Sequence, residues 1–379
     1  MLLIKNACLI DMAGNYKEKA DILMEGRRFR KIEPAIQAEG CEVIDAAGRL
    51  VTPGLIESHC HLAMGDSAGQ DINEKTGPLH PGLRAIDAID FFSPDFDAAL
   101  AAGVTTLAIG PGSSNLIGGT FAAVKSAGDS IPRRIVREEL CMKMALGENP
   151  KGNYGPLGRM PATRMGSAAL LRDALWRARD YRERRFRCEQ KGDGKAPFDL
   201  DMDSLMRVFD GMPVKIHVHK ENDIRAAIRI GREFGLRFTL EHCTEGYRMT
   251  QELKEAGAMP ILGPIVGGKG KLELAEKRFD GPALFEKAGI PFAITTDSPV
   301  IPMEGLLMQA AVLIKHGLSE KAAYEGLTVN AAKAIGLWEE IGSIAPGKQA
   351  DLVIWDREPF STGQRAGVVV VDGKVRYWA

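Results

Sequence analysis

The chain has 379 residues, which at ~150 residues per domain predicts two to three domains, and 45% of them are hydrophobic, so a large core can be buried. Lys and Arg number 49 against 50 for Asp and Glu, and a formal net charge of -1 argues against a nucleic acid or an anionic membrane surface as the main partner. With no apolar run of ~18 residues, no signal peptide and six irregularly spaced cysteines, we expect a cytoplasmic protein without disulfides.

The two ends of the chain carry the same kind of pattern. Residues 1–52 contain short strand-like runs, and residues 343–379 contain two more, the second with a hairpin turn at Asp372-Gly373. Neither end has enough strands to form a core alone. We therefore predict that both termini pair into one small β-sandwich domain, made from residues 1–52 and 343–379.

The middle of the chain, residues 53–342, alternates apolar strands with helices. The expected strands are 55–62, 103–110, 140–147, 213–219, 237–243, 258–264 and 291–297, and the expected helices are Asp95–Ala102, Ala168–Arg187, Asn222–Phe234, Tyr247–Ala256 and Pro282–Ala288. Strands rich in Val, Ile and Leu, followed by helices, indicate parallel strands buried on both faces. This pattern predicts an α/β fold, a (β/α)8 TIM-like barrel with one strand unrecognised, rather than a doubly wound open sheet.

One predicted helix is rich in arginine. Between Leu171 and Arg187 the chain has seven Arg against three acidic residues. Because the chain as a whole has no positive excess, we interpret this stretch as a solvated helix face rather than a site for RNA or phosphate.

Most of the histidines lie where predicted barrel strands end. His59 and His61 are two residues apart on one strand, so both imidazoles point to the same side. Three more histidines and an aspartate end later strands, at His217, His219, His242 and Asp297. Catalytic groups of barrels lie at these carboxyl ends, and imidazole and carboxylate are the ligands that Zn²⁺ prefers. The pattern predicts a metal site; His80, His316, Cys60 and Cys243 are expected to be structural.

Three segments resemble the amidohydrolase superfamily. VTPGLIESHCHL (51–62) is similar to the first barrel strand with its H-x-H motif, LTVNAAKAIGL (327–337) to the last helix, and GSIAPGKQADLVIWD (342–356) to the return into the β-sandwich. VKIH (214–217) resembles the imidazolonepropionase-related subgroup. The resemblance covers essentially the whole chain and implies a metal-dependent hydrolase of C–N bonds, built as a distorted barrel with a sandwich from both termini.

The resemblance also implies roles for individual residues. Metal ligands would be His59, His61, His217, His242 and Asp297. The remaining ligand is either Glu148, in the manner of the N-acetylglucosamine-6-phosphate deacetylases, or a carbamylated Lys143; we prefer Glu148, because it lies at the strand end. We expect one or two divalent ions per chain, with Zn²⁺ as the expected metal.

A mechanism follows from such a site. A bound Zn²⁺ lowers the pKa of its water to ~7, and Asp297 would take the proton and deliver it to the leaving nitrogen. His219 would supply a further donor. We expect substrate contacts from Asn149, Lys151 and Tyr154, and we expect the loops 111–119 and 263–271 to line the barrel mouth.

The preferred function is hydrolysis of an amide, a cyclic amide or a dipeptide. The alternative is a deaminase of a heterocyclic amidine, which is disfavoured because Val218-His219-Lys220 follows His217 where deaminases of this superfamily carry His-x-x-Glu. A non-catalytic scaffold is disfavoured by the full set of ligands. We expect a small-molecule substrate, no nucleic acid or membrane partner, and a homo-oligomer.

Overall fold

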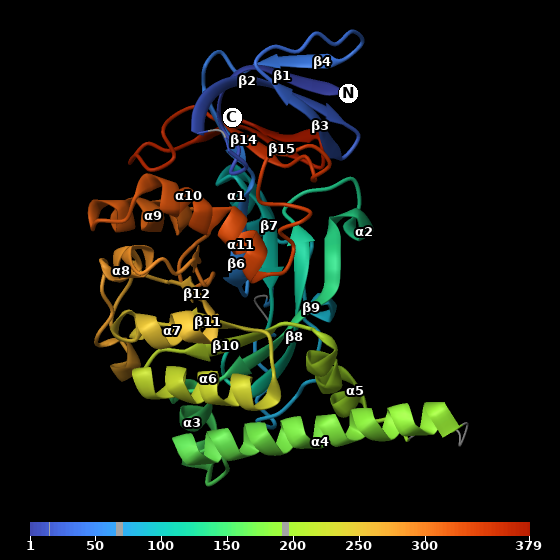
Figure 1. Ribbon diagram of the computed structural model, residues 1–379, viewed down its shortest axis with the longest axis vertical. Helices are drawn as coiled ribbons and strands as arrows, with labels where there is room; N and C mark the ends of the chain where they lie inside the picture. The colour runs from blue at the N-terminus through green and yellow to red at the C-terminus, as the bar shows by residue number, and fades with distance from the viewer. Residues whose placement is uncertain (15, 66–70, 192–196) are drawn as a thin grey trace.

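The computed structural model describes residues 1–14, 16–65, 71–191 and 197–379 (Figure 1). One eight-stranded sheet runs in chain order and curves into a nearly closed barrel. Its strands are β6 (Leu55–Cys60), β7 (Val104–Ile109), β8 (Ile117–Lys125), β9 (Ile135–Ala145), β10 (Val214–Val218), β11 (Phe238–His242), β12 (Met259–Leu262) and β13 (Ala293–Ile294). The seven predicted barrel strands are all present, and a nearly closed barrel with an additional sheet agrees with the predicted class of fold.

The unrecognised strand is β8, which runs antiparallel to both β7 and β9. Its first residues lie in the segment 111–119 that we expected to be a loop. Gly118, Gly119, Ala122 and Ala123 give β8 little strand propensity, but small residues are needed here. At Gly119, where φ is +107°, a Cβ atom would lie 2.3 Å from the carbonyl oxygen of Leu83, in a segment that packs along β8.

The last and first strands are joined by side chains instead of a regular ladder. Glu57 of β6 is fully buried and accepts hydrogen bonds from Thr295 and from both the backbone and the hydroxyl of Thr296, which follow β13. The backbone N–H of His61 also donates to the carbonyl of Ser298 at 2.7 Å. Burial raises the pKa of Glu57 to about 7 despite these bonds. Glu57 therefore holds the closing edge of the barrel beside the strand end that carries His59.

Helices connect the barrel strands and cover their outer side (Figure 1). They are α1 (Asp95–Ala101), α2 (Ile131–Arg134), α3 (Glu148–Tyr154), α4 (Arg164–Lys191), α5 (Leu200–Met206), α6 (Glu221–Phe234), α7 (Thr250–Ala256), α8 (Gly281–Lys287), α9 (Gly305–Lys315), α10 (Glu320–Leu327) and α11 (Val329–Ala334). None of the helices in the described ranges is long and apolar enough to cross a membrane.

The two ends of the chain form a second sheet at one end of the molecule (Figure 1). Its strand order is β16-β15-β14-β5-β1-β2-β3, with β4 paired to β1. The bounds are β1 (Leu2–Ile10), β2 (Tyr16–Glu25), β3 (Arg28–Glu33), β4 (Glu42–Asp45), β5 (Leu50–Pro53), β14 (Leu352–Trp355), β15 (Ala366–Val371) and β16 (Lys374–Trp378). Ile4, Ile22, Leu352 and Val370 belong to a hydrophobic cluster that both termini build, whereas Trp355 packs with the barrel core. The division into domains at residues 52/53 and 342/343 stays a prediction.

A buried ion pair joins the two sheets. Lys125, at the end of β8, contacts the carboxylate of Asp351 and lies 3.1 Å from the hydroxyl of Thr106. The other oxygen of Asp351 accepts the backbone N–H of Asp372 at 2.9 Å, and both ionised side chains are at most 6% exposed. The apolar pattern of β8 thus ends on a lysine whose charge is neutralised by the second sheet.

We expect Lys125→Met to destabilise the protein by ~3–5 kcal/mol, because it leaves the Asp351 carboxylate buried without a cation. Chemical denaturation followed by circular dichroism measures the change. Lys374→Met removes a lysine whose ion pair with Asp129 is at the surface, and this control should leave stability almost unchanged. Equal stabilities for the two variants would contradict the role of Lys125.

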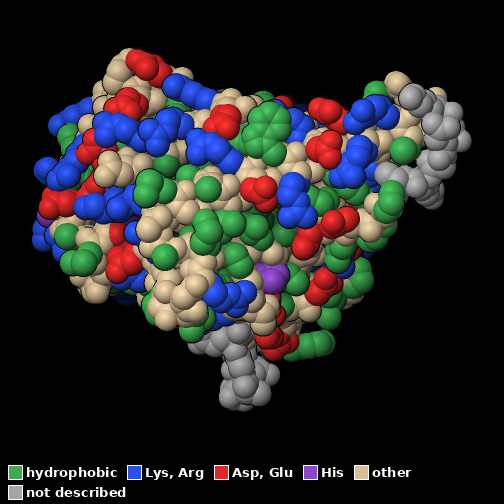
Figure 2. Space-filling view, turned by 90° about the horizontal axis from the view of Figure 1, so that it is seen from below, with side chains coloured by type: hydrophobic (Ala, Val, Ile, Leu, Met, Phe, Trp, Pro, Cys, Tyr) green, Lys and Arg blue, Asp and Glu red, His purple; other side chains and the backbone are tan. Residues whose placement is uncertain are grey.

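The arginine-rich helix α4 forms an outer face of the molecule (Figure 1). Arg172 pairs with Glu233 at 2.7 Å, Arg182 with Asp210 at 2.7 Å, and Arg184 with Asp180 at 3.0 Å. Figure 2, seen from below the view of Figure 1, shows Lys and Arg side chains interspersed with Asp and Glu. This arrangement agrees with a solvated, ion-paired helix face.

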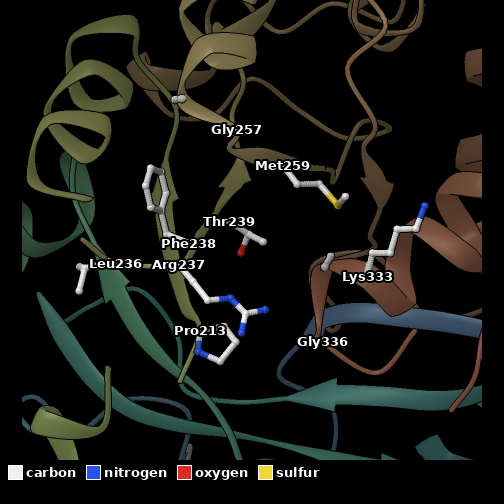
Figure 3. Close-up of a pocket in the computed structure, with 11 residues that line it drawn as sticks. Pro213, Leu236, Arg237, Phe238, Thr239, Gly257, Met259, Lys333 and Gly336 are labelled. Atoms are coloured by element: carbon white, nitrogen blue, oxygen red, sulfur yellow. The ribbon is translucent and has the colours of Figure 1, made fainter. Parts of the chain in front are cut away.

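A cavity of about 380 Å³ lies at the amino ends of β10, β11 and β12 (Figure 3). Arg237 and Lys333 contribute cations to its wall, and the described residues that line it include no histidine or carboxylate. In barrels this end contributes to stability, and reactive groups gather at the other. Reactive groups are therefore expected at the carboxyl ends of the strands.

Candidate metal centre

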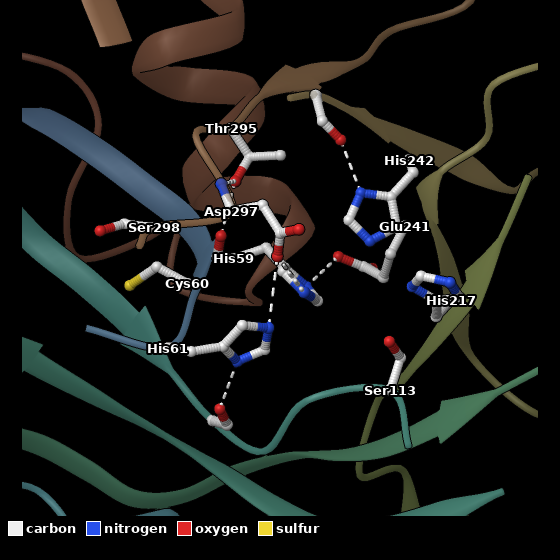
Figure 4. Close-up of polar contacts among 12 residues, drawn as sticks. His59, Cys60, His61, Ser113, His217, Glu241, His242, Thr295, Asp297 and Ser298 are labelled. Atoms are coloured by element: carbon white, nitrogen blue, oxygen red, sulfur yellow. Dashed lines mark hydrogen bonds and ion pairs between the residues drawn. The ribbon is translucent and has the colours of Figure 1, made fainter. Parts of the chain in front are cut away.

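The structure brings the predicted histidines and the predicted aspartate together at the carboxyl ends of the barrel strands (Figure 4). They form two groups, and within each group the potential ligand atoms lie within 4.8 Å of one another. One group contains His59, His61 and Asp297, and the other contains His217, His219 and His242. The groups adjoin, because the ring centroids of His59 and His242 are 5.4 Å apart.

Two of these residues leave their strands in a left-handed backbone conformation. The φ angle is +66° at His242 and +55° at Asp297, where residues other than glycine are uncommon. Such strained positions persist only where the surrounding structure holds them, and they concentrate at functional sites. Here the backbone N–H of Cys243 donates to Val218, and that of Val300 donates to Asp297. The turns that follow β11 and β13 are thus braced around the site.

Most of the imidazoles are oriented by a partner at Nδ1. In His61 this atom lies 2.6 Å from the carbonyl oxygen of Gly110, and in His242 it lies 2.5 Å from the carbonyl oxygen of Gly263. Since a carbonyl only accepts, Nδ1 carries the proton in both rings and Nε2 keeps its lone pair. In His59, Nδ1 lies 2.6 Å from a carboxylate oxygen of Glu241. Metal-binding histidines are held in this way by carbonyls and carboxylates.

The electrostatics of the site suit a cation. Burial, together with the charges of Lys143 and neighbouring groups, lowers the pKa of His59 and His217 well below the usual 6.5, and burial also lowers the pKa of His242. Burial alone would raise the pKa of Asp297, but His242, His61 and Lys143 bring it down to about 2. Neutral imidazoles beside an ionised carboxylate are the protonation states that metal binding requires.

Lys143 reaches the centre from inside β9. Its side chain is fully buried, and its Nζ lies 3.2 Å from Nε2 of His59. Burial lowers the pKa of Lys143 to about 8. Lys215, its register partner on β10, instead lies 3.0 Å from the carboxylate of Glu241. Lys143 is therefore the buried amine that faces the metal-type ligands.

Glu148, which we preferred as the sixth ligand, belongs to neither group of potential ligands. It is the first residue of α3, beyond a turn at Gly147 where φ is +92°. Its carboxylate lies 3.4 Å from the backbone nitrogen of Glu273, from which it accepts a hydrogen bond. The long side chain of Lys143 reaches from within β9 to the imidazole of His59, whereas the side chain of Glu148 points to the loop after β12.

The predicted substrate contacts are in three different settings. Asn149 lies at the site, where its Nδ2 is 3.5 Å from Nε2 of His217 and donates to Ser113 at 2.7 Å. Lys151 is partly exposed on α3. The hydroxyl of Tyr154 is buried between the carbonyl of Gly77 and the amide of Asn115, so its polar group is already used within the protein.

Two carboxylates of the site were not predicted. Glu241 of β11 is fully buried between His59 and Lys215, and its position beside His242 in an apolar strand was the available signal. Glu273 comes from a short 3-10 helix, Leu272–Leu274, in the segment between β12 and α8. Its Oε1 lies 3.6 Å from Nε2 of His219, and burial raises its pKa. A loop glutamate carries no sequence pattern that would reveal this position.

A nearly closed barrel with imidazoles, a carboxylate and a buried lysine at its strand ends defines a metal-dependent hydrolase of the barrel class. The model of the amidohydrolase family matches residues 50–376, and the chain belongs to this family. The family relationship confirms the prediction of an imidazolonepropionase-related hydrolase that acts on carbon–nitrogen bonds, and the family generally uses divalent metals.

Individual relatives agree with this assignment. The chain is 28% identical to the amidohydrolase tasK of Hapsidospora irregularis over 94% of its own length, but it spans only 40% of that protein. It is 26% identical to the imidazolonepropionase of Klebsiella pneumoniae (strain 342), covering 93% of this chain and 91% of that protein. A crystal structure of an amidohydrolase from Thermotoga maritima superposes with a TM-score of 0.97, at 34% identity over all of both chains.

Proposed function

We propose that this protein hydrolyses an amide or cyclic amide bond, including that of a dipeptide, with water activated at a divalent metal centre, and that the metal is zinc. The observation that carries the proposal is the position of Lys143, whose buried Nζ lies 3.2 Å from His59 in the centre formed by the two groups of ligands. A carbamylated lysine at this position would supply an oxygen ligand to a divalent metal bound by these groups. We therefore propose Lys143, in place of Glu148, as the remaining ligand.

The residues present fit a metal ion. Nδ1 of His217 is buried and has no hydrogen-bond partner, which is costly for an imidazole unless an ion or proton donor occupies its lone pair. The proposed ligands are His59, His61, His217, His242, Asp297 and Lys143. When bound, a divalent ion supplies a water of lowered pKa and polarises a carbonyl oxygen.

The proton transfers are assigned to Asp297. Its Oδ1 lies 3.2 Å from Nε2 of His61, and the side chain is 15% exposed, so one end of the carboxylate faces the barrel mouth. We propose that it takes a proton from water and delivers it to the leaving nitrogen. His219, which adjoins His217 with ring centroids 4.7 Å apart, is proposed as a further polar contact to the substrate.

The substrate is proposed to be a small molecule. We propose Asn149 as a direct contact, and its amide, which lies between Ser113 and His217, supports this role. Lys151 and Tyr154 remain proposed contacts without such support. A cytoplasmic location and a homo-oligomeric state likewise stay predictions. For the deaminase alternative, the position of the acid–base glutamate is Lys220, which is paired with Glu245.

A turnover screen tests the proposal. The metal-loaded protein would be offered dipeptides, N-acyl amino acids, cyclic ureides and imidazolones, and release of the amine or ring-opened acid would be measured. We expect hydrolysis of at least one of these classes, which disappears after treatment with a chelator. Release of ammonia from an amidine, without hydrolysis of any amide, would support the deaminase instead.

Metal content gives a separate prediction. Purified protein should hold one or two transition-metal ions per chain by elemental analysis, and His59→Ala with His61→Ala should lower this number, because one group of ligands loses both imidazoles. His316→Ala serves as a control, since His316 lies at the end of α9 and should not affect metal content. Protein without metal after growth in supplemented medium would contradict the assignment of the site.

A further inference from the structure

Glu273 is a buried carboxylate to which the proposed hydrolysis gives no task. Only 3% of its surface is exposed. Its Oε2 accepts the backbone N–H of Glu148 at 2.9 Å, whereas Oε1 is buried and has no hydrogen-bond partner. One oxygen is therefore satisfied by α3, and the other lies beside the imidazoles of His217 and His219 without a hydrogen bond.

No lysine or arginine in the described part of the chain forms an ion pair with this oxygen. Within the described residues, no Lys or Arg nitrogen lies within 4.0 Å of Glu273; its neighbours at this range are Nε2 of His219 at 3.6 Å and Nε2 of His217 at 4.0 Å. Lys271 comes from the same loop, but its Nζ donates to Oδ1 of Asn149 at 2.8 Å. A carboxylate that is buried with one oxygen unpaired is costly unless a positive group pairs with it.

The position of Oε1 limits where that positive group belongs. It adjoins His217, one of the proposed metal ligands, so a cation bound there would lie within a few bonds of the amide being cleaved. In a dipeptide or an amino acid amide, the free amino group is only a few bonds away from the carbonyl carbon of the amide. A side-chain ammonium at the end of a long chain lies farther from it.

We propose that Glu273 binds a protonated amino group close to the scissile carbonyl, so that the enzyme acts on amides of amino acids with a free amino end. This inference rests on the proposed amide hydrolysis and adds the charge of the substrate. Glu273 is then a specificity residue that touches substrate. Its neighbour Lys271, by holding Asn149, keeps the same wall of the site in place.

Binding of two matched probes tests the proposal. Glycinamide and propionamide have the same number of heavy atoms and differ by an ammonium in place of a methyl group, and at pH 6.5 the amino group is protonated. We expect the metal-loaded protein to bind glycinamide about tenfold or more tightly than propionamide, as a charged hydrogen bond implies. Saturation-transfer NMR measures both affinities.

Glu273→Gln should bring the ratio of the two affinities close to one while keeping the acceptor for the Glu148 N–H. Glu276→Gln makes the same charge change in the same loop, at an exposed residue paired with Arg248, and should keep the preference. If Glu273→Gln does not fold, Glu273→Asp, which retains the charge but shortens the side chain, should show a reduced preference.

Three results would overturn the inference. The first is equal affinity of the wild-type protein for glycinamide and propionamide. The second is an unchanged ratio of these affinities in Glu273→Gln, which would mean that the ammonium binds elsewhere, for instance on the metal. A loss of bound metal in Glu273→Gln would make the carboxylate a metal ligand. Amide turnover combined with a ratio near one refutes only this inference. A clear glycinamide preference in a protein without metal or turnover would refute the proposed hydrolase and keep only the ammonium-binding role of Glu273.

Discussion

Asp297→Asn is expected to lower kcat by ~10²–10⁴-fold with a much smaller change in KM, because general acid–base catalysis contributes about this factor. Asn has the same shape as Asp but cannot accept the proton. The side chain follows β13, and its Oδ1 lies 3.2 Å from Nε2 of His61 and 3.6 Å from Nε2 of His59. Steady-state kinetics on a substrate found in the turnover screen measure the effect.

The same carboxylate is a proposed metal ligand, so metal must be measured in the same samples. Thr296→Val serves as a matched neighbour, since the Thr296 hydroxyl bonds to Glu57 rather than to the histidines and its loss should mainly affect stability. A metal-replete Asn variant that turns over substrate at nearly the wild-type rate would show that Asp297 is not the base. His219 would then be the next residue to test.

Lys143→Met is expected to remove at least one metal ion per chain and to reduce activity by at least ~100-fold, since even residues that only support ligands cost 10–100-fold when lost. Met fills a similar volume, so the buried position should stay packed. If the amine reacts with carbon dioxide, wild-type protein prepared without bicarbonate should regain metal and activity when bicarbonate is added. Elemental analysis and turnover follow both effects.

Glu148→Gln tests whether Glu148 or Lys143 supplies the remaining metal ligand. The Glu148 side chain contacts the backbone of Glu273 and belongs to neither group of histidines, so we expect nearly full metal content and only modest effects on turnover. The opposite pattern, with metal lost in Glu148→Gln and kept in Lys143→Met, would restore the glutamate as the ligand and exclude a carbamate.

The sequence by itself determined the class of fold and the main chemical groups of the site. Strand periodicity is local, so a residue that ends an apolar run, such as His59, His217 or Asp297, must emerge at the strand end, and parallel strands bring those ends to one face. The motif around His59 and His61 and the return near Asp351 carried the family resemblance, because each is a short contiguous segment.

Only the tertiary structure decided which other side chains reach that face. The choice between Lys143 and Glu148 depends on a turn at Gly147 that points one side chain away and on a long side chain that extends from inside β9. β8 was missed because its small residues are required by a packing segment near Leu83, which lies far along the chain. Glu273 enters from a loop between β12 and α8, and no local pattern encodes where such a loop folds back. These features arise from contacts between distant segments, whereas the strand-end histidines follow from the period of the strand itself.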